Sequence, residues 1–417
     1  MSTAPQPVKA TGAHRLRVVS GNAALGAAFW RLWTANLLSE TGSQLSRVAL
    51  VLALAGGLSP IAAVALLVFC ETLPGSAVAF VSGAIVDRGD KRVIMIAADV
   101  IRAALVGFVA INPAAVFIYA MAAIKSMAGA FFSPARSALI PRVVDTERLA
   151  KANSMDQASS TIVMIAAPLL GAQLYMWFGL KATLLVDAAS FLVSAALVFG
   201  IRSRYEPLDV EEWSESPLAS VWRGWRYIAS NVLARHLLAL TTVSLLCVGL
   251  WIPVAPAFIR EFLASPGRVL GVQLSLFGIG GFFGSLMAAP LAARFGKGHV
   301  VTIALFCEAT AMTAYSVTRW PALSGGIIFL WGTIVSIMVV SFNALLQEHV
   351  PGHYLGRVFA VLQQLESSAT VLAVLLAASL EHVLTPQGIF FAAGVTYISL
   401  IAASVRMRGG RVLMRTF

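Results

Sequence analysis

Ionisable side chains stand near the middle of several long apolar stretches of this sequence: Glu40, Glu71, Lys125 and Glu366. A charge is costly in the interior of a membrane, so residues of this kind mark substrate or proton pathways. A carboxyl group in such a setting can exchange a proton. We expect at least one of these acids to do so. The alternative is a pair, such as Glu71 with Lys125, that only neutralises itself.

Other charges in apolar stretches favour a structural role. Asp99 and Arg102 are three residues apart and share one face of a helix, which predicts an intramembrane ion pair. Glu308 also falls near mid-depth, whereas Asp187 falls closer to the outer surface and Arg47 close to it.

The composition indicates a membrane protein. Hydrophobic residues make up 59% of the 417 residues and charged residues 12%, against about 45–50% and 25% in soluble domains. Such a chain is neither a soluble domain nor disordered.

Stretches of about 20 mostly apolar residues, the length that spans a bilayer as a helix, predict twelve membrane spans and an all-α fold. They cover 29–56, 60–86, 93–111, 114–134, 153–177 and 180–201, then 236–259, 269–293, 299–318, 323–347, 358–381 and 387–405.

These spans divide the chain into two six-helix bundles with connecting segments. The predicted units are a tail 1–28, a bundle 29–201, a linker 202–235, a bundle 236–405 and a tail 406–417. Aromatic and basic residues alternate in the linker from Trp222 to Tyr227, which favours an amphipathic helix at the membrane surface.

The basic residues set the orientation. With both termini in the cytoplasm, most of the 30 Lys and Arg lie on the cytoplasmic side, and the external loops hold only Lys181, Arg260, Arg268 and Arg319. This is the positive-inside pattern. It explains the net charge of +11 without nucleic acid as a partner.

The two halves repeat. Arg88 and Lys91 lie 206 positions before Arg294 and Lys297, and Val144 lies the same distance before Val350. Basic loops alone do not explain a common register. Duplicated halves are typical of secondary transporters, whose substrate site lies at their interface near the midplane.

The motif between the second and third spans runs Gly83-Ala-Ile-Val-Asp87-Arg88-Gly-Asp90-Lys91-Arg92. We expect Gly83 to allow close helix approach. The motif resembles the signature loop of the major facilitator superfamily, a resemblance that implies a conformational latch rather than substrate contact. The second copy has Ala293 where Asp87 stands. The residues to which the latch is assigned are Gly83, Asp87, Arg88, Lys91, Arg92 and Arg136.

Further motifs narrow the resemblance to one branch. Ser133-Pro134-Ala-Arg136 ends the fourth span, and Val350-Pro351 followed by Leu355-Gly356-Arg357 opens the eleventh. Together they are similar to drug and siderophore exporters, including macrolide efflux pumps and enterobactin exporters. The resemblance implies the twelve-helix major facilitator fold and export of small amphipathic molecules by alternating access, with proton antiport. It also implies that spans 3, 6, 9 and 12 lie outside the cavity, so Arg102, Asp187 and Glu308 are not expected to touch substrate.

Several other functions are disfavoured. Gly280 and Gly284 lie inside an apolar span, so they predict tight helix packing rather than a nucleotide loop. The sequence carries no HExxH or GxSxG motif, so we expect no enzyme, no metal site and no cofactor. The expected partners are a small-molecule substrate, protons and membrane lipid, with a monomer in a bacterial-type cytoplasmic membrane. Uptake, lysolipid or lipid flipping and nutrient sensing remain alternatives.

Overall fold

The computed structural model describes residues 25–57, 59–201 and 217–406, and within them every regular element is a helix. The N-terminal helices are α1 (Ala27–Leu54), α2 (Pro60–Arg88), α3 (Lys91–Ile111), α4 (Ala115–Val143), the short 3-10 helix η1 (Thr146–Arg148) and α5 (Leu149–Phe199). After α6 (Pro217–Ser230) come α7 (Val232–Gly249), α8 (Trp251–Glu261), α9 (Arg268–Phe295), α10 (Lys297–Val317), α11 (Pro321–His349), α12 (Gly352–Leu380) and α13 (Pro386–Arg406).

Ten helices in this described part are long and apolar enough to cross a membrane, with α7 and α8 counted as one. The chain is therefore a multi-pass membrane protein. Helix α5 consists of two helices that meet at Gly179, whose φ of 74° and ψ of −179° are not helical. Helix α1, with 28 residues, is not among the ten. The count of twelve spans stays a prediction.

The expected repeat reappears in the helix boundaries. Helices α3 and α10 both have 21 residues, and α4 and α11 both have 29. Each later helix begins 206 positions after its counterpart. Two helix starts are also fixed locally, because the side chains of Asp90 and Asn231 accept hydrogen bonds from backbone N–H groups of the following turn.

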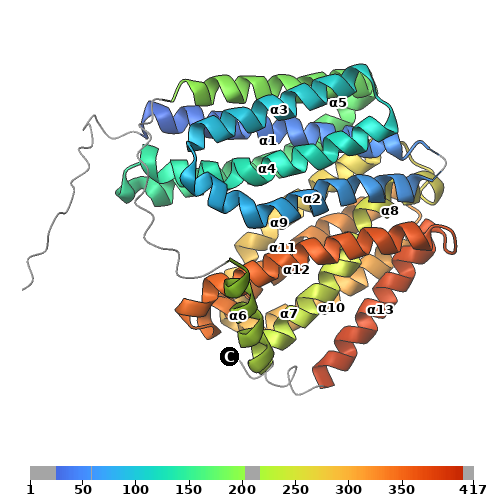
Figure 1. The fold of residues 1–417 in the computed structure, drawn as a ribbon. Coiled ribbons are helices and arrows are strands. Elements are labelled where there is room, and N and C mark those ends of the chain that lie inside the picture. Colours follow the sequence, from blue (N-terminus) through green and yellow to red (C-terminus); the bar gives the residue numbers. More distant parts are fainter. Residues whose placement is uncertain (1–24, 58, 202–216, 407–417) are drawn as a thin grey trace, which may run out of the picture.

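Figure 1 shows α1–α5 on one side of the molecule and α7–α13 on the other, with α6 beside α12. The two sides meet where α2 packs on α12 and α8, and where α5 packs on α9. Residues 1–24 of the predicted N-terminal tail, 202–216 of the linker and 407–417 of the C-terminal tail lie outside the described residues. The predicted unit boundaries stay predictions.

Small residues bring helices α9 and α11 unusually close. A Cβ atom added at Gly280 would lie 2.0 Å from the carbonyl oxygen of Phe329, and one at Gly284 would lie 2.2 Å from that of Thr333. The packing role expected for this glycine pair is confirmed. The expectation for Gly83 is wrong in this conformation, because a Cβ there would meet nothing within 4 Å.

Candidate functional site

A cavity of about 750 Å³ opens beside α1, α2 and α4. The polar and charged side chains that line it include Glu40, Gln44, Arg47, Glu71, Arg102, Lys125 and Gln363. The structure thus gathers three of the four ionisable residues expected in a cavity. The fourth, Glu366, is exposed on α12 and is not among the lining residues. The roles of all four stay predictions.

Glu40 is held by neutral groups. Its Oε2 atom accepts a hydrogen bond from Ser160 Oγ at 3.0 Å and a longer one from Asn36 Nδ2 at 3.4 Å. None of the ion pairs described for residues 25–57, 59–201 and 217–406 includes Glu40. This carboxyl group lines the cavity, so its charge is available to a proton or to a cationic ligand.

Glu71 pairs with a residue that the sequence did not assign to it. Arg47 Nε lies 3.0 Å from Glu71 Oε2, and both side chains remain partly exposed. The alternative in which Glu71 neutralises Lys125 is therefore wrong. The reason is rotational position: α1 turns Arg47, and α2 turns Glu71, so that the two side chains meet in the cavity wall.

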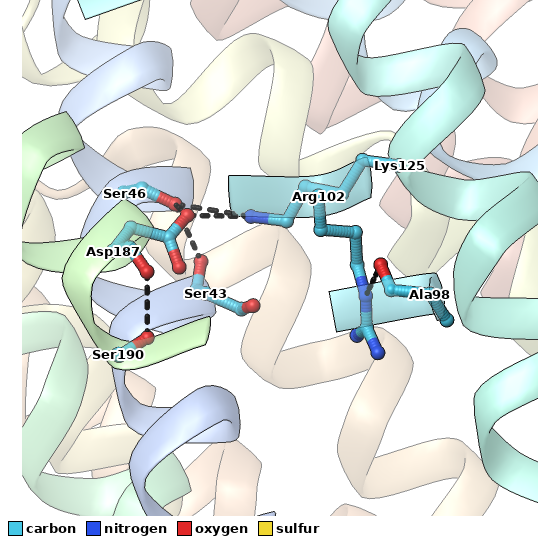
Figure 2. A network of polar contacts seen from close by, with 7 residues as sticks. All are labelled: Ser43, Ser46, Ala98, Arg102, Lys125, Asp187 and Ser190. Carbon is cyan, nitrogen blue, oxygen red and sulfur yellow. Dashed lines mark hydrogen bonds and ion pairs between the residues drawn. The ribbon is translucent and has the colours of Figure 1, made fainter. Parts of the chain in front are cut away.

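Lys125 instead reaches Asp187 on α5. Its Nζ atom lies 2.7 Å from Asp187 Oδ2 and 3.3 Å from Ser46 Oγ, as Figure 2 shows. Ser46 donates a second bond of 2.5 Å to the same carboxylate oxygen. Asp187 is fully buried, and its Oδ1 atom has no hydrogen-bond partner in the part of the chain that the structure describes. The ammonium group of Lys125 thus lies in the cavity wall, whereas its counter-ion Asp187 is buried and does not line the cavity.

Arg102 departs from the position expected from the resemblance. It forms the predicted ion pair with Asp99 at 2.8 Å, and Ser194 Oγ donates to the other carboxylate oxygen at 2.6 Å. Its guanidinium also lies over the rings of Phe132 and Phe191, 4.5 and 4.7 Å from their centroids. Yet Arg102, which belongs to α3, lines the cavity. Arg102 therefore lies in the cavity wall although span 3 is expected outside it, and the expectation that Arg102 does not touch substrate stays a prediction.

Glu308 is buried in the C-terminal helices, away from the cavity. Its Oε2 atom accepts hydrogen bonds from Ser244 Oγ at 2.9 Å and Tyr397 OH at 2.7 Å. Arg102 and Phe191, which stack on each other, lie 206 positions before Glu308 and Tyr397. The same pair of positions therefore makes a contact in each half, with different chemistry.

Two basic residues assigned to the latch bind carbonyl groups at helix ends. Arg92 donates to the carbonyl groups of Val198 and Phe199 at the end of α5, and Lys91 Nζ donates to Gly89 O at 3.0 Å. Such contacts suit cations, because the last carbonyl groups of a helix lack partners and carry partial negative charge.

Arg136, also assigned to the latch, pairs with Asp156 on α5. Arg88 is exposed at the end of α2. The side chain of Asp87 lies outside the described residues. The latch itself stays a prediction.

Sequence reasoning missed three partners: Arg47 for Glu71, Asp187 for Lys125 and Asp156 for Arg136. The sequence does contain hints of the Asp187 pair. Asp187 is a charge in an apolar stretch, which indicates a partner, and Ser43 and Ser46 on α1 are polar residues in another apolar stretch. Neither observation shows that α1, α4 and α5 bring these residues into contact.

The sequence is similar to known membrane transporters. A model of the Major Facilitator Superfamily matches residues 32–374. Macrolide efflux protein A of Streptococcus pyogenes is 25% identical over 367 residues, which cover 84% of this chain and 88% of that protein. The multidrug efflux pump Tap of Mycolicibacterium fortuitum is 26% identical over 355 residues, covering 80% and 84%.

Solved structures share the fold at low identity. The nucleoside transporter NupG superposes with a TM-score of 0.74 at 12% identity, covering 91% of this chain and all of that one. A bacterial homolog of the human lysosomal transporter Spinster, solved in an inward-facing and unoccupied conformation, gives a TM-score of 0.70 at 12% identity and covers 95% and 98%.

Proposed function

Because this chain belongs to the Major Facilitator Superfamily, we propose that it is a secondary transporter that exports small amphipathic molecules in exchange for protons. It acts by alternating access in a bacterial cytoplasmic membrane, as a monomer with both termini in the cytoplasm, and catalyses no chemical reaction. Relatives that are named as macrolide and multidrug efflux proteins support export.

The observation that carries the proposal is the cavity with Glu40 in its wall. Each of the other charged residues in the cavity wall has an opposite charge in contact: Arg47 with Glu71, Lys125 with Asp187 and Arg102 with Asp99. Among the described residues, Glu40 has only Ser160 and Asn36 as hydrogen-bond partners. A proton and a cationic amphipathic substrate would therefore compete for Glu40, and mutually exclusive binding of two ligands is the basis of exchange.

The geometry of the cavity supports loading from the cytoplasm. Its wall extends to Gly83 and Pro134, near the ends of α2 and α4 that carry the basic loops. We call this the basic end of the molecule. By the positive-inside rule the basic end is cytoplasmic, so the conformation described is the one that would receive a substrate from inside the cell.

Proton release in inverted membrane vesicles with an acidic interior tests the proposal. Macrolides, lipophilic cations, catecholate siderophores and lysolipids would be added in turn to vesicles that hold wild type, Glu40→Gln, Glu71→Gln or Glu366→Gln. Glu147→Gln is the matched control, since Glu147 is an exposed acid on η1. We expect alkalinisation by one compound class, lost in Glu40→Gln and kept in the control.

Other outcomes would redirect the proposal. Unchanged proton release in Glu40→Gln would reject the role given to Glu40, and loss in Glu71→Gln or Glu366→Gln would move coupling there. Transport of a compound without any need for a pH gradient would favour lipid flipping. Accumulation of substrate inside intact cells would favour uptake.

A further inference from the structure

The connection between α1 and α2 is held at both ends by side chains from the other half of the chain. Glu381, which follows α12, accepts hydrogen bonds from the backbone N–H groups of Ile61 and Ala62 at 3.2 and 2.7 Å. Arg260, near the end of α8, donates to the carbonyl oxygen of Ala55 at 2.7 Å. All three bonds lie at the end of the molecule opposite the basic end.

Glu381 fills a vacancy at the start of α2. The first N–H groups of a helix have no partner within the helix and are usually capped by a nearby side chain. Ser59 occupies the capping position but makes no capping hydrogen bond, and Pro60 has no N–H to offer. The carboxylate of Glu381 takes over this capping role from across the interface, where its charge also suits the helix dipole.

Arg260 performs the complementary task at the end of α1. Ala55 is the C-terminal capping residue of α1, and carbonyl groups at such an end favour a cation. The side chain of Arg260 is half exposed and also touches Glu261 at 3.3 Å. A negative side chain thus meets the start of one helix, and a positive side chain meets the end of the preceding helix.

We infer that Glu381 and Arg260 form a second latch, separate from the one assigned to Arg136 and the loop between α2 and α3. This second latch holds the non-basic end closed by capping helix ends in the opposite half. This second latch has no counterpart in the N-terminal half. The residues 206 positions earlier are Tyr175 and Leu54, which carry no charge. When this end opens, the three backbone groups lose their partners. The two side chains therefore set how often the transporter opens at this end, independently of the substrate.

Distances between two spin labels test the latch in the full chain without any substrate. Ala114 and Ala322 are exposed positions at the non-basic end, one in each half, and each would be changed to Cys after Cys70, Cys247 and Cys307 are replaced. Pulsed EPR in lipid nanodiscs then reports a short distance for the closed end and a longer one for the open end.

The expected results follow from hydrogen-bond strength. Glu381→Gln keeps the size of the side chain but removes the charge, and Arg260→Ala removes the donor. Each should raise the ratio of open to closed molecules about tenfold, the equivalent of one charge-assisted hydrogen bond. The charge-matched control is Glu147→Gln, since Glu147 is an exposed acid on η1 at the basic end of the molecule; it should leave the ratio unchanged.

A variant in the other half keeps the test decisive if Glu381→Gln folds poorly. Ser59→Asp offers the N–H groups of α2 a cap within their own half, so it should also favour opening while leaving Glu381 intact. The proposal is refuted if Glu381→Gln and Glu147→Gln give the same distance distribution, or if Ser59→Asp leaves the distribution of the wild type unchanged. Neither result would bear on which substrate or ion is carried.

Discussion

Replacing Lys125 by Met tests whether its ion pair with Asp187 stabilises the fold. Removing one partner of a buried ion pair costs about 3–5 kcal/mol, because a charge is left without compensation. Asp187 is fully buried, whereas the Lys125 side chain is 19% exposed at the cavity wall. Without Lys125, the carboxylate keeps only Ser46 as a described partner. We therefore expect Lys125→Met to cost about 3 kcal/mol or more.

The reverse change should cost less. In Asp187→Asn, the ammonium group of Lys125 can still reach water in the cavity, so the loss is nearer that of a single hydrogen bond to a charged group, about 1.5–3 kcal/mol. The double variant Lys125→Met with Asp187→Asn removes both charges. It should recover about 2 kcal/mol relative to the sum of the single changes, because no buried charge is left uncompensated.

Thermal unfolding of the purified chain in detergent measures these differences. For a unit the size of one half, about 1 kcal/mol shifts the apparent Tm by about 2–4 °C, so Lys125→Met should lower it by roughly 6–12 °C. Double-variant losses equal to the sum of the single losses would refute the coupling. If the double variant is stable, its transport activity then separates a role in proton exchange from a role in folding alone.

Two further predictions concern packing and buried hydrogen bonds. Gly280→Ala forces a methyl group to within 2.0 Å of Phe329 O, so it should lower the free energy of unfolding by about 1–3 kcal/mol or more. Gly326→Ala is the control: nothing lies within 4 Å of the added methyl group, so the apparent Tm should stay equal or rise. Equal Tm values for both variants would contradict the described packing. Tyr397→Phe removes a 2.7 Å hydrogen bond to Glu308 and should cost about 1–3 kcal/mol, a loss that Glu308→Gln should largely avoid, as paired unfolding curves would show.

The helices were largely predictable from sequence because apolar length is a local property. The predicted span 93–111 corresponds to α3 (Lys91–Ile111), and the predicted break between residues 177 and 180 corresponds to the left-handed Gly179. Ten apolar helices and the 206-residue offset follow from the same local signals. Hydropathy does not show that α7 ends and α8 begins on either side of Leu250, since both segments are apolar.

The pairing of charges was not predictable in the same way. Depth along a helix follows from residue counting, but the direction of a side chain changes by a full turn every 3.6 residues. Residue counting places both Glu71 and Lys125 near the middle of their spans, yet α2 turns Glu71 toward Arg47, and α4 turns Lys125 toward Asp187. Partners on different helices therefore depend on packing that no single stretch of sequence contains.

The distribution of these pairs has a consequence for how the transporter would move. The ion pairs described within the membrane-spanning part of the N-terminal half are Arg47–Glu71, Asp99–Arg102, Lys125–Asp187 and Arg136–Asp156. Since both partners of each pair belong to helices α1–α5, a rocking motion of one half against the other would leave all of them intact and would expose no unpaired buried charge. The described polar bonds that must break at the non-basic end are those of Glu381 and Arg260 to backbone groups. Such bonds are individually modest, so closure there is strong enough to favour one state and weak enough to be reversed by a ligand that binds differently to the two states.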